Sequence, residues 1–225
     1  MRTLLKYWLV MLGLMVACVL APNAARATIA GTSHDLSGTA PGGQLCVACH
    51  APHHVPGSPL IWNHVLSANN FSWSDATETT GGTTLPTNIK TWSGTSKNCL
   101  SCHDGTVEIG KIYTPGVTFD STKITGPAQI ATLTGDLKGN HPVAVPYPYN
   151  QVANTYNAIT TGGGVTTTEY TAVPAKVKVY TDPLGGANNH GIECASCHDA
   201  HGTIFPDFLR DALTGSAICL DCHIK

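Results

Sequence analysis

The chain has 225 residues, with 12 lysines and arginines against 14 aspartates and glutamates, so its formal net charge is −2 at neutral pH. This near-neutral balance excludes the basic surface that nucleic-acid binding requires, and the length suits one domain or at most two. No stretch beyond the N-terminus approaches about eighteen consecutive apolar residues, which excludes an integral membrane protein.

The first 27 residues have the pattern of an export signal. Arg2 and Lys6 supply positive charge, residues 7–20 are largely apolar, and Ala25 and Ala27 form a small-residue cleavage site. The alternative is an uncleaved anchor helix, which Pro22 disfavours because it interrupts the apolar run. The sequence therefore predicts a cleaved signal peptide, residues 1–27, and an exported mature chain, residues 28–225.

The mature chain differs from the whole sequence in charge and in sulfur content. It keeps 9 of the 12 basic residues and all 14 acidic ones, which gives 9 − 14 = −5. It also keeps eight of the nine cysteines and none of the three methionines. Leu, Ile, Val and Phe make up about one fifth of it, a level at which chains struggle to bury a core unaided. Something other than side chains is therefore expected to fill the interior.

Regular secondary structure is expected to be sparse, because 23 glycines and 14 prolines interrupt the chain. Two Thr/Gly-rich stretches, residues 75–84 and 160–169, are predicted to be exposed loops or short irregular strands. Residues 175–180 alternate apolar and polar side chains as a half-exposed strand does. Residues 206–213 suit a helix of about two turns, with proline near the start and Gly215 just past the end.

One pentapeptide, Cys-x-x-Cys-His, occurs four times and uses every cysteine of the mature chain. Two thiols at this spacing bond to the two vinyl groups of one haem, and the adjacent histidine coordinates its iron. Disulfides and zinc ribbons also use paired cysteines, but neither requires a histidine after each pair, and thioredoxin-like redox pairs occur singly. The sequence therefore predicts four covalently bound c-type haems. The attachment cysteines are Cys46, Cys49, Cys99, Cys102, Cys194, Cys197, Cys219 and Cys222, and the proximal iron ligands are His50, His103, His198 and His223.

The second ligand of each iron follows by elimination. The mature chain has no methionine and no spare thiol, which leaves histidine, and seven histidines lie outside the motifs. His53 and His201 each lie three residues after a proximal histidine, too close to reach the opposite face of the same haem. Each should therefore ligate a different haem, or contact a haem propionate.

The other histidines are less closely constrained. His141 precedes a proline, which favours extended backbone and suits a side chain presented from a loop. His64 is equally consistent with iron ligation and with packing, and His54 and His190 are expected to face solvent or propionates. The predicted distal ligands are His34, His53, His141 and His201, with His64 as a further candidate.

Four haems would also supply the core that the side chains lack, because the macrocycles are large and mostly apolar. The expected fold class is a multihaem cytochrome c. It is mostly irregular coil, with a few short helices and short strands wrapped around a chain of four haems, and it forms a single domain over residues 28–225.

These features resemble the exported tetrahaem c-type cytochromes of metal-reducing bacteria, and most specifically the filament-forming, OmcE-like nanowire cytochromes. The resemblance implies bis-histidine ligation throughout, a continuous haem chain and a homopolymer in which His53 of one subunit ligates a haem of the next. It also implies other multihaem cytochromes as electron donors and extracellular metal oxides or cells as acceptors. The segments that carry it are residues 33–37, 46–53, 59–63, 96–106, 136–143, 193–202 and 219–223.

The expected function is therefore electron transfer along the haems, at the cell surface or outside the cell, with no catalysed reaction. A soluble periplasmic tetrahaem shuttle is the main alternative, although such shuttles are shorter and often lysine-rich for docking to acidic partners. A multihaem oxyanion reductase is a further alternative. It would need one iron with an open position, and the surplus of histidines argues against that.

Overall fold

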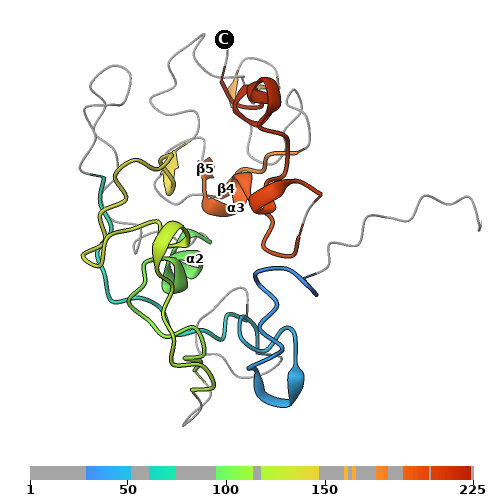
Figure 1. Ribbon diagram of the computed structural model, residues 1–225. Helices are drawn as coiled ribbons and strands as arrows, with labels where there is room; N and C mark the ends of the chain where they lie inside the picture. The colour runs from blue at the N-terminus through green and yellow to red at the C-terminus, as the bar shows by residue number, and fades with distance from the viewer. Residues whose placement is uncertain are drawn as a thin grey trace, which may run out of the picture.

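The computed structural model describes residues 29–51, 61–73, 95–113, 118–146, 160–161, 164–165, 176–181, 190–202 and 204–223. Most of this chain is coil and turn, with short helices and strands between (Figure 1). The predicted signal peptide and the Thr-rich stretch 75–84 lie outside the described residues. Within the described part, no helix is both long and apolar enough to span a bilayer.

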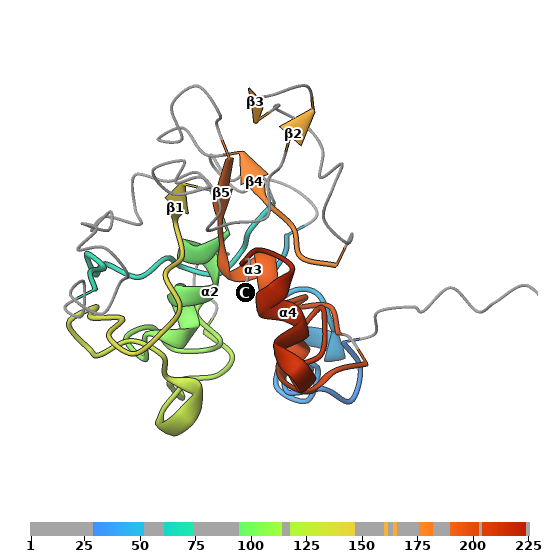
Figure 2. The ribbon, with the colours of Figure 1, turned by 90° about the horizontal axis from the view of Figure 1, so that it is seen from above.

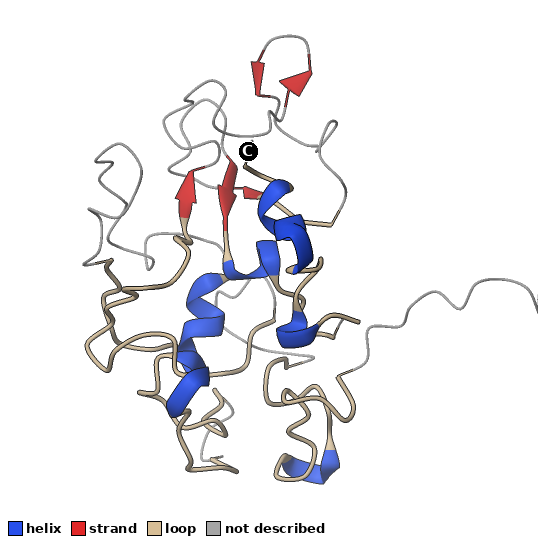
Figure 3. Ribbon diagram, turned by 45° about the horizontal axis from the view of Figure 1, so that its top comes forward, coloured by secondary structure: helices blue, strands red, loops and turns tan. Residues whose placement is uncertain are grey.

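The helices are short, and three of them carry haem motifs. α2 spans Ser96–His103, α3 spans Cys194–Cys197, and α4 spans Ala217–Leu220 (Figure 3). Single 3-10 turns lie between them and elsewhere: η1 is Pro41–Gly43, η4 is Gly126–Ala128, η7 is Pro206–Phe208 and η8 is Thr214–Ser216.

A small antiparallel sheet leads into the third motif. Its strand order is β1-β5-β4, where β1 is Val145–Pro146, β4 is Tyr180–Thr181 and β5 is His190–Ile192. Val145 pairs with Ile192, and Tyr180 pairs with Gly191. Figure 2 shows β5 between β1 and β4 and running directly into α3. The sheet thus fixes where the third motif begins.

A second, two-stranded sheet pairs β2, Thr160–Thr161, with β3, Gly164–Val165. The prediction of loop or short irregular strand for residues 160–169 agrees with this hairpin as far as that stretch is described. In the stretch 175–180, predicted to be a half-exposed strand, burial alternates only over residues 176–178, where Val177 is buried between the exposed Lys176 and Lys178. The strand prediction is wrong for residues 176–179, which are turn and coil, because the paired strand β4 begins only at Tyr180.

The prediction of a two-turn helix over residues 206–213 is wrong. Only the 3-10 turn η7 forms there, and Asp207 and Phe208 adopt left-handed φ values of 53° and 59°. The backbone of this segment pairs instead with the end of the third motif: Asp199 N donates to Phe208 O and Arg210 N donates to Cys197 O, both at 2.8 Å. These backbone groups are therefore not available for helical bonds.

The side-chain core is small and split into two clusters. The first consists of Phe71, Trp73, Leu100, Ala131, Leu137, Ala144, Val145 and Ile192. The second consists of Val177, Leu209 and Ile218. Cys222 packs against both clusters. A core of this size agrees with the low content of large aliphatic residues.

Candidate haem-binding sites

Each Cys-x-x-Cys-His motif forms a tight helical turn. In three of them the histidine N–H donates to the carbonyl of the first cysteine, at 2.8 Å for His50, 3.1 Å for His198 and 2.8 Å for His223. The second motif lies within α2. A helical turn brings residues three apart to the same face. The two thiols of each motif can therefore approach one edge of a flat ligand.

None of the eight described cysteines forms a disulfide, so all eight are available for thioether bonds. Burial raises the pKa of Cys49 and Cys197 to about 11, and that of Cys102 to about 12. These thiols are therefore protonated at neutral pH in the folded chain.

The motifs follow one another in space in the order of the sequence. The nearby Cys49 thiol adds to burial in raising the pKa of Cys102, and Cys222 does the same for Cys197. Between these two contacts, the thiols of Cys99 and Cys194 share a hydrogen bond. Consecutive motifs are thus close neighbours from the first to the fourth.

Glu193 joins the second motif to the third. Its Oε2 accepts hydrogen bonds from Ser96 N at 2.8 Å and Ser96 Oγ at 2.5 Å, at the start of α2. The same carboxylate caps α3 in a capping box with Ser196, and Cys194 N donates to Ser96 Oγ at 3.0 Å. Glu193 and Ser96 are each 1% exposed. One buried carboxylate therefore caps the N-termini of two motif helices, where negative charge is favourable.

Three pairs of histidine rings face one another at the same separation. The ring centres of His34 and His103, of His50 and His201, and of His141 and His223 are each 6.1 Å apart. The interplanar angles are 72°, 14° and 68° respectively. Imidazole nitrogens bind first-row metals at about 2.1 Å with the ring centre about 1.1 Å behind, so two axial imidazoles lie about 6.4 Å apart. The three pairs fit iron held between two histidines.

Hydrogen bonds orient several of these rings through Nδ1. The partner is Ala200 O at 3.2 Å for His34, Ala128 O at 2.7 Å for His103, Pro142 O at 2.9 Å for His141 and Asp207 O at 2.7 Å for His198. A carbonyl can only accept, so each Nδ1 carries the proton and Nε2 keeps its lone pair. The rings are thus in the tautomer that binds a metal through Nε2.

The surroundings of two rings also favour the neutral imidazole. Burial lowers the pKa of His34, against the opposing effect of the Ala200 carbonyl, and burial followed by the charge of His141 lowers the pKa of His223. His34 also stacks on Phe208, with ring centres 4.5 Å apart and planes 11° from parallel. A neutral ring in a fixed orientation suits a metal ligand.

A glycine just after α2 allows the backbone approach that brings the His103 ring to its hydrogen-bond partner, Ala128 O. Gly105 adopts a φ of +71°, and a Cβ there would lie 2.8 Å from Ile124 O. Only glycine fits this turn without strain. The segment around η4 can therefore approach the end of α2, where Ala128 O accepts the bond from His103 and Ile130 N donates to His103 O at 2.9 Å.

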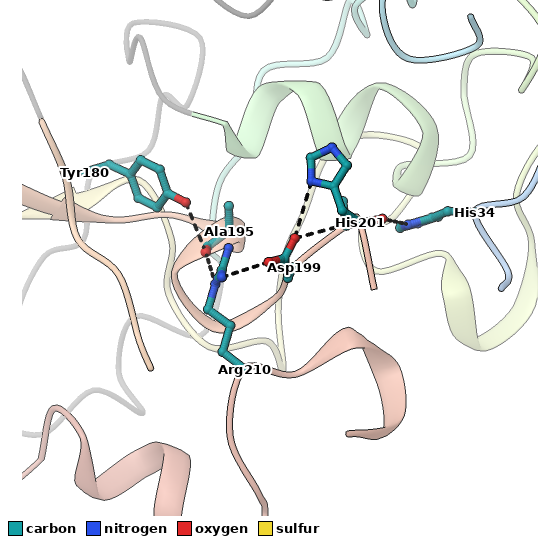
Figure 4. A network of polar contacts seen from close by, with 7 residues as sticks. His34, Tyr180, Ala195, Asp199, His201 and Arg210 are labelled. Atoms are coloured by element: carbon teal, nitrogen blue, oxygen red, sulfur yellow. Dashed lines mark hydrogen bonds and ion pairs between the residues drawn. The ribbon is translucent and has the colours of Figure 1, made fainter. Parts of the chain in front are cut away.

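His201 differs from the other rings because a carboxylate faces it. Asp199 Oδ1 accepts a bond from His201 N at 3.1 Å and lies 3.4 Å from His201 Nδ1. Asp199 Oδ2 pairs with Arg210 Nη1 at 3.0 Å, and Arg210 Nε donates to Ala195 O at 2.9 Å (Figure 4). Tyr180 Oη donates to the same carbonyl at 3.2 Å. Burial works to raise the pKa of Asp199, but the His201 backbone N–H and the Arg210 charge outweigh it and the pKa lies below its usual value.

His64 packs against the second motif. It is 1% exposed, with Nδ1 2.9 Å from Val65 O and Nε2 3.0 Å from Glu108 O. Its Nε2 also lies 3.3 Å from Cys102 Sγ. Both ring nitrogens therefore contact protein atoms, as in the packing alternative left open by the sequence.

The structure thus brings three of the four predicted distal histidines, His34, His141 and His201, opposite motif histidines. His201 faces His50 and not its sequence neighbour His198, as the three-residue spacing requires. His53 and His54 lie outside the described residues, as does the side chain of His190. Among the described side chains, no imidazole faces His198 at the separation seen in the three pairs.

Sequence reasoning missed the polar residues that support the motifs. Glu193 carries a local signal, because it stands directly before a motif helix and three residues before Ser196, the spacing of a capping box. The pairing of Asp199 with Arg210 leaves no such signal, since it depends on how η7 folds back.

Comparison with known proteins supports the assignment of the cofactor. Residues 186–225, which contain the third and fourth motifs, match the family model described as the doubled CXXCH motif. No curated protein matches the sequence. The doubled motif indicates a multihaem c-type cytochrome, a protein that binds haem covalently and transfers electrons.

Proposed function

We propose that this chain is a tetrahaem electron-transfer protein in which histidine occupies both axial positions of each iron, and that it is not an enzyme. The observation that carries the proposal is the set of three imidazole pairs with ring centres 6.1 Å apart. In each pair one histidine belongs to a Cys-x-x-Cys-His motif and the other comes from elsewhere in the chain.

In this proposal the three pairs supply the distal ligands of three motifs. His201 serves the first motif, His34 the second and His141 the fourth. When bound, haem supplies a one-electron iron couple. Two fixed imidazoles keep substrate and water away from the metal, so the protein has to move little between the two oxidation states.

The order of the motifs supports conduction through the molecule. Cys49 of the first motif helps to raise the pKa of Cys102 in the second, and Cys222 of the fourth helps to raise the pKa of Cys197 in the third. The thiols of Cys99 and Cys194 link the second motif to the third. A protein that holds four attachment sites in one unbroken series provides an entrance at one end and an exit at the other.

His198 suggests how copies of the chain join. His34, His141 and His201 already face other motifs, so His198 needs a further ligand, and we assign it to His53 of a second copy. Repetition of this contact builds a homopolymer. Export by the N-terminal signal would place the filament at the cell surface or outside the cell, where other multihaem cytochromes supply electrons and metal oxides or cells accept them.

The ligation is tested on the purified holoprotein by haem quantification and by absorption and electron paramagnetic resonance spectroscopy. We expect four haems per chain, all low-spin, with no methionine-type absorption band and no prompt binding of carbon monoxide. Rapid binding of carbon monoxide to one of the four haems in the assembled protein would instead indicate an open iron, and with it the reductase alternative.

The assembly is tested by electron microscopy of secreted wild-type protein and of a His53→Ala variant, with His54→Ala as the neighbouring control. Long fibres are expected for the wild type and the control, and short or absent fibres for His53→Ala. Monomers of wild-type protein would favour the soluble shuttle, and unchanged fibres from His53→Ala would remove this residue from the intersubunit contact.

A further inference from the structure

Five of the histidines proposed as iron ligands have a described partner at Nδ1, and these partners are not all of one kind. His34, His103, His141 and His198 each place Nδ1 near a backbone carbonyl, which is neutral. His201 places Nδ1 3.4 Å from Asp199 Oδ1, which belongs to an ionisable carboxyl group. That distance is longer than a normal hydrogen bond, so the interaction is mainly one of charge.

The carboxylate is itself held in place from its other side. Arg210 Nη1 pairs with Asp199 Oδ2 at 3.0 Å, and the Arg210 side chain is only 12% exposed. Arg210 Nε is fixed in turn by Ala195 O inside the third motif, at 2.9 Å. Asp199 Oδ1 also accepts the His201 backbone N–H at 3.1 Å. The carboxylate therefore has one orientation, with one oxygen toward the histidine and the other toward the arginine (Figure 4).

A carboxylate near the outer nitrogen of a ligating imidazole makes that ligand more electron-rich, because it attracts the Nδ1 proton. An electron-rich axial ligand stabilises the ferric over the ferrous iron, and a nearby negative charge acts in the same direction. A positive partner such as Arg210 weakens both effects. The two side chains thus act on the same ligand with opposite sign.

From this geometry we propose that Asp199 and Arg210 form a tuning pair, in which Asp199 lowers and Arg210 raises the reduction potential of the haem held by His50 and His201. Asp199 is a positioning residue in this role, since it acts through His201 and does not contact the iron. The inference rests on the proposed function, because it requires His50 and His201 to ligate one iron. It adds that Asp199 and Arg210 make the reduction potential of this haem differ from those of the other three.

The test compares Asp199→Asn and Arg210→Gln with wild-type holoprotein by spectroelectrochemical titration. Asp199→Asn should raise the potential of one haem out of four, by about a tenfold change in its reduction equilibrium, which is about 59 mV for a one-electron couple. Arg210→Gln should lower the potential of the same haem, because it leaves the carboxylate unopposed. Asp199→Glu, which keeps the charge, should restore most of the wild-type value.

Asp120→Asn is the matched control. It removes a carboxylate whose described side-chain bonds go to Thr122, at 2.9 Å to N and 2.6 Å to Oγ1, and it should leave all four potentials unchanged. Shifts of the same sign in Asp199→Asn and Arg210→Gln, or no shift in either, would overturn the inference. Those outcomes differ from a failure of the proposed function, which would appear in the wild type itself as missing haems or high-spin iron.

Discussion

The central and outer motifs of this protein are built differently. We call Cys99–His103 and Cys194–His198 the central motifs, and Cys46–His50 and Cys219–His223 the outer motifs. The central motifs share the buried Glu193 cap, and their first cysteines share a hydrogen bond. The first cysteines of the outer motifs, Cys46 and Cys219, are exposed.

This difference means that the polypeptide stabilises the two central motifs and leaves the first cysteine of each outer motif exposed to solvent. Leu100 of the second motif belongs to the larger core cluster, as does Ile192 just before the third motif. Among the described residues, the outer motifs reach this cluster only through the partly buried Cys222. The outer motifs present their first thiol sites at the surface. The conduction that we propose would use this arrangement, because a rigid centre would fix the internal distances while the two ends would remain accessible to partners.

The largest effect is expected from removal of a thiol pair. Cys46→Ala with Cys49→Ala should give an exported protein with three haems per chain. Cys99→Ala with Cys102→Ala should give little folded protein, because α2 is buried on the side of Leu100 and Ser101, both 0% exposed. Haem content per chain and yield of secreted protein measure the difference. Equal yields from the two double variants would mean that the central and outer motifs are equivalent.

A smaller effect is expected from Glu193→Gln, which keeps the shape of the buried cap and removes its charge. A hydrogen bond to a charged group contributes about 1.5–3 kcal/mol and a neutral one about 1 kcal/mol, so loss of the charge should lower the free energy of unfolding by about 1–2 kcal/mol. Chemical denaturation of the holoprotein measures it. Glu108→Gln, at the exposed ion pair with Lys111, is the control and should cause no measurable change. A Glu193→Gln variant as stable as this control would show that the central cap is dispensable.

The smallest effect is expected at Asp221, a buried carboxyl of an outer motif. Burial and the nearby Asp211 raise its pKa above the ordinary 3.8, although Lys176 opposes them. The folded state therefore binds this proton more tightly than the unfolded state, and the carboxylate costs stability above the unfolded pKa. Asp221→Asn should stabilise the protein at neutral pH, and the gain should disappear as the pH falls below 3.8.

Thermal unfolding at several pH values checks the sign of this prediction. If Asp221→Asn lowered the midpoint at neutral pH, the outer motif would depend on a buried carboxylate just as the central motifs depend on Glu193. The contrast between the two kinds of motif would then not extend to their carboxyl groups.

Much of the candidate site could be predicted from the sequence, because the Cys-x-x-Cys-His spacing is a local signal. The sequence also restricted the possible partners of His201, since three residues cannot span a macrocycle. It could not pair His34 with His103 or His141 with His223, because those pairings depend on how distant loops fold back. Glu193 stands outside the motif pattern and was missed for that reason, although its capping spacing was visible.

The fold could be predicted only in outline. Sparse secondary structure followed from the glycine and proline content, and the burial alternation of residues 176–178 followed from their sequence. The helix expected over residues 206–213 failed because propensity is a weak local preference, and pairing with the end of the third motif outweighed it. The same pairing places Phe208 against His34. The segment that departs from its helix propensity is therefore the one that contacts His34, a candidate iron ligand.

The burial of Cys49, Cys102 and Cys197 affects when haem can be attached to these three thiols. With a pKa of about 11 for Cys49 and Cys197 and about 12 for Cys102, the reactive thiolate is a fraction on the order of 10⁻⁴ to 10⁻⁵ at neutral pH. An extended chain, whose cysteines titrate normally, reacts far faster. Covalent attachment of haem to these cysteines should therefore come before the chain folds.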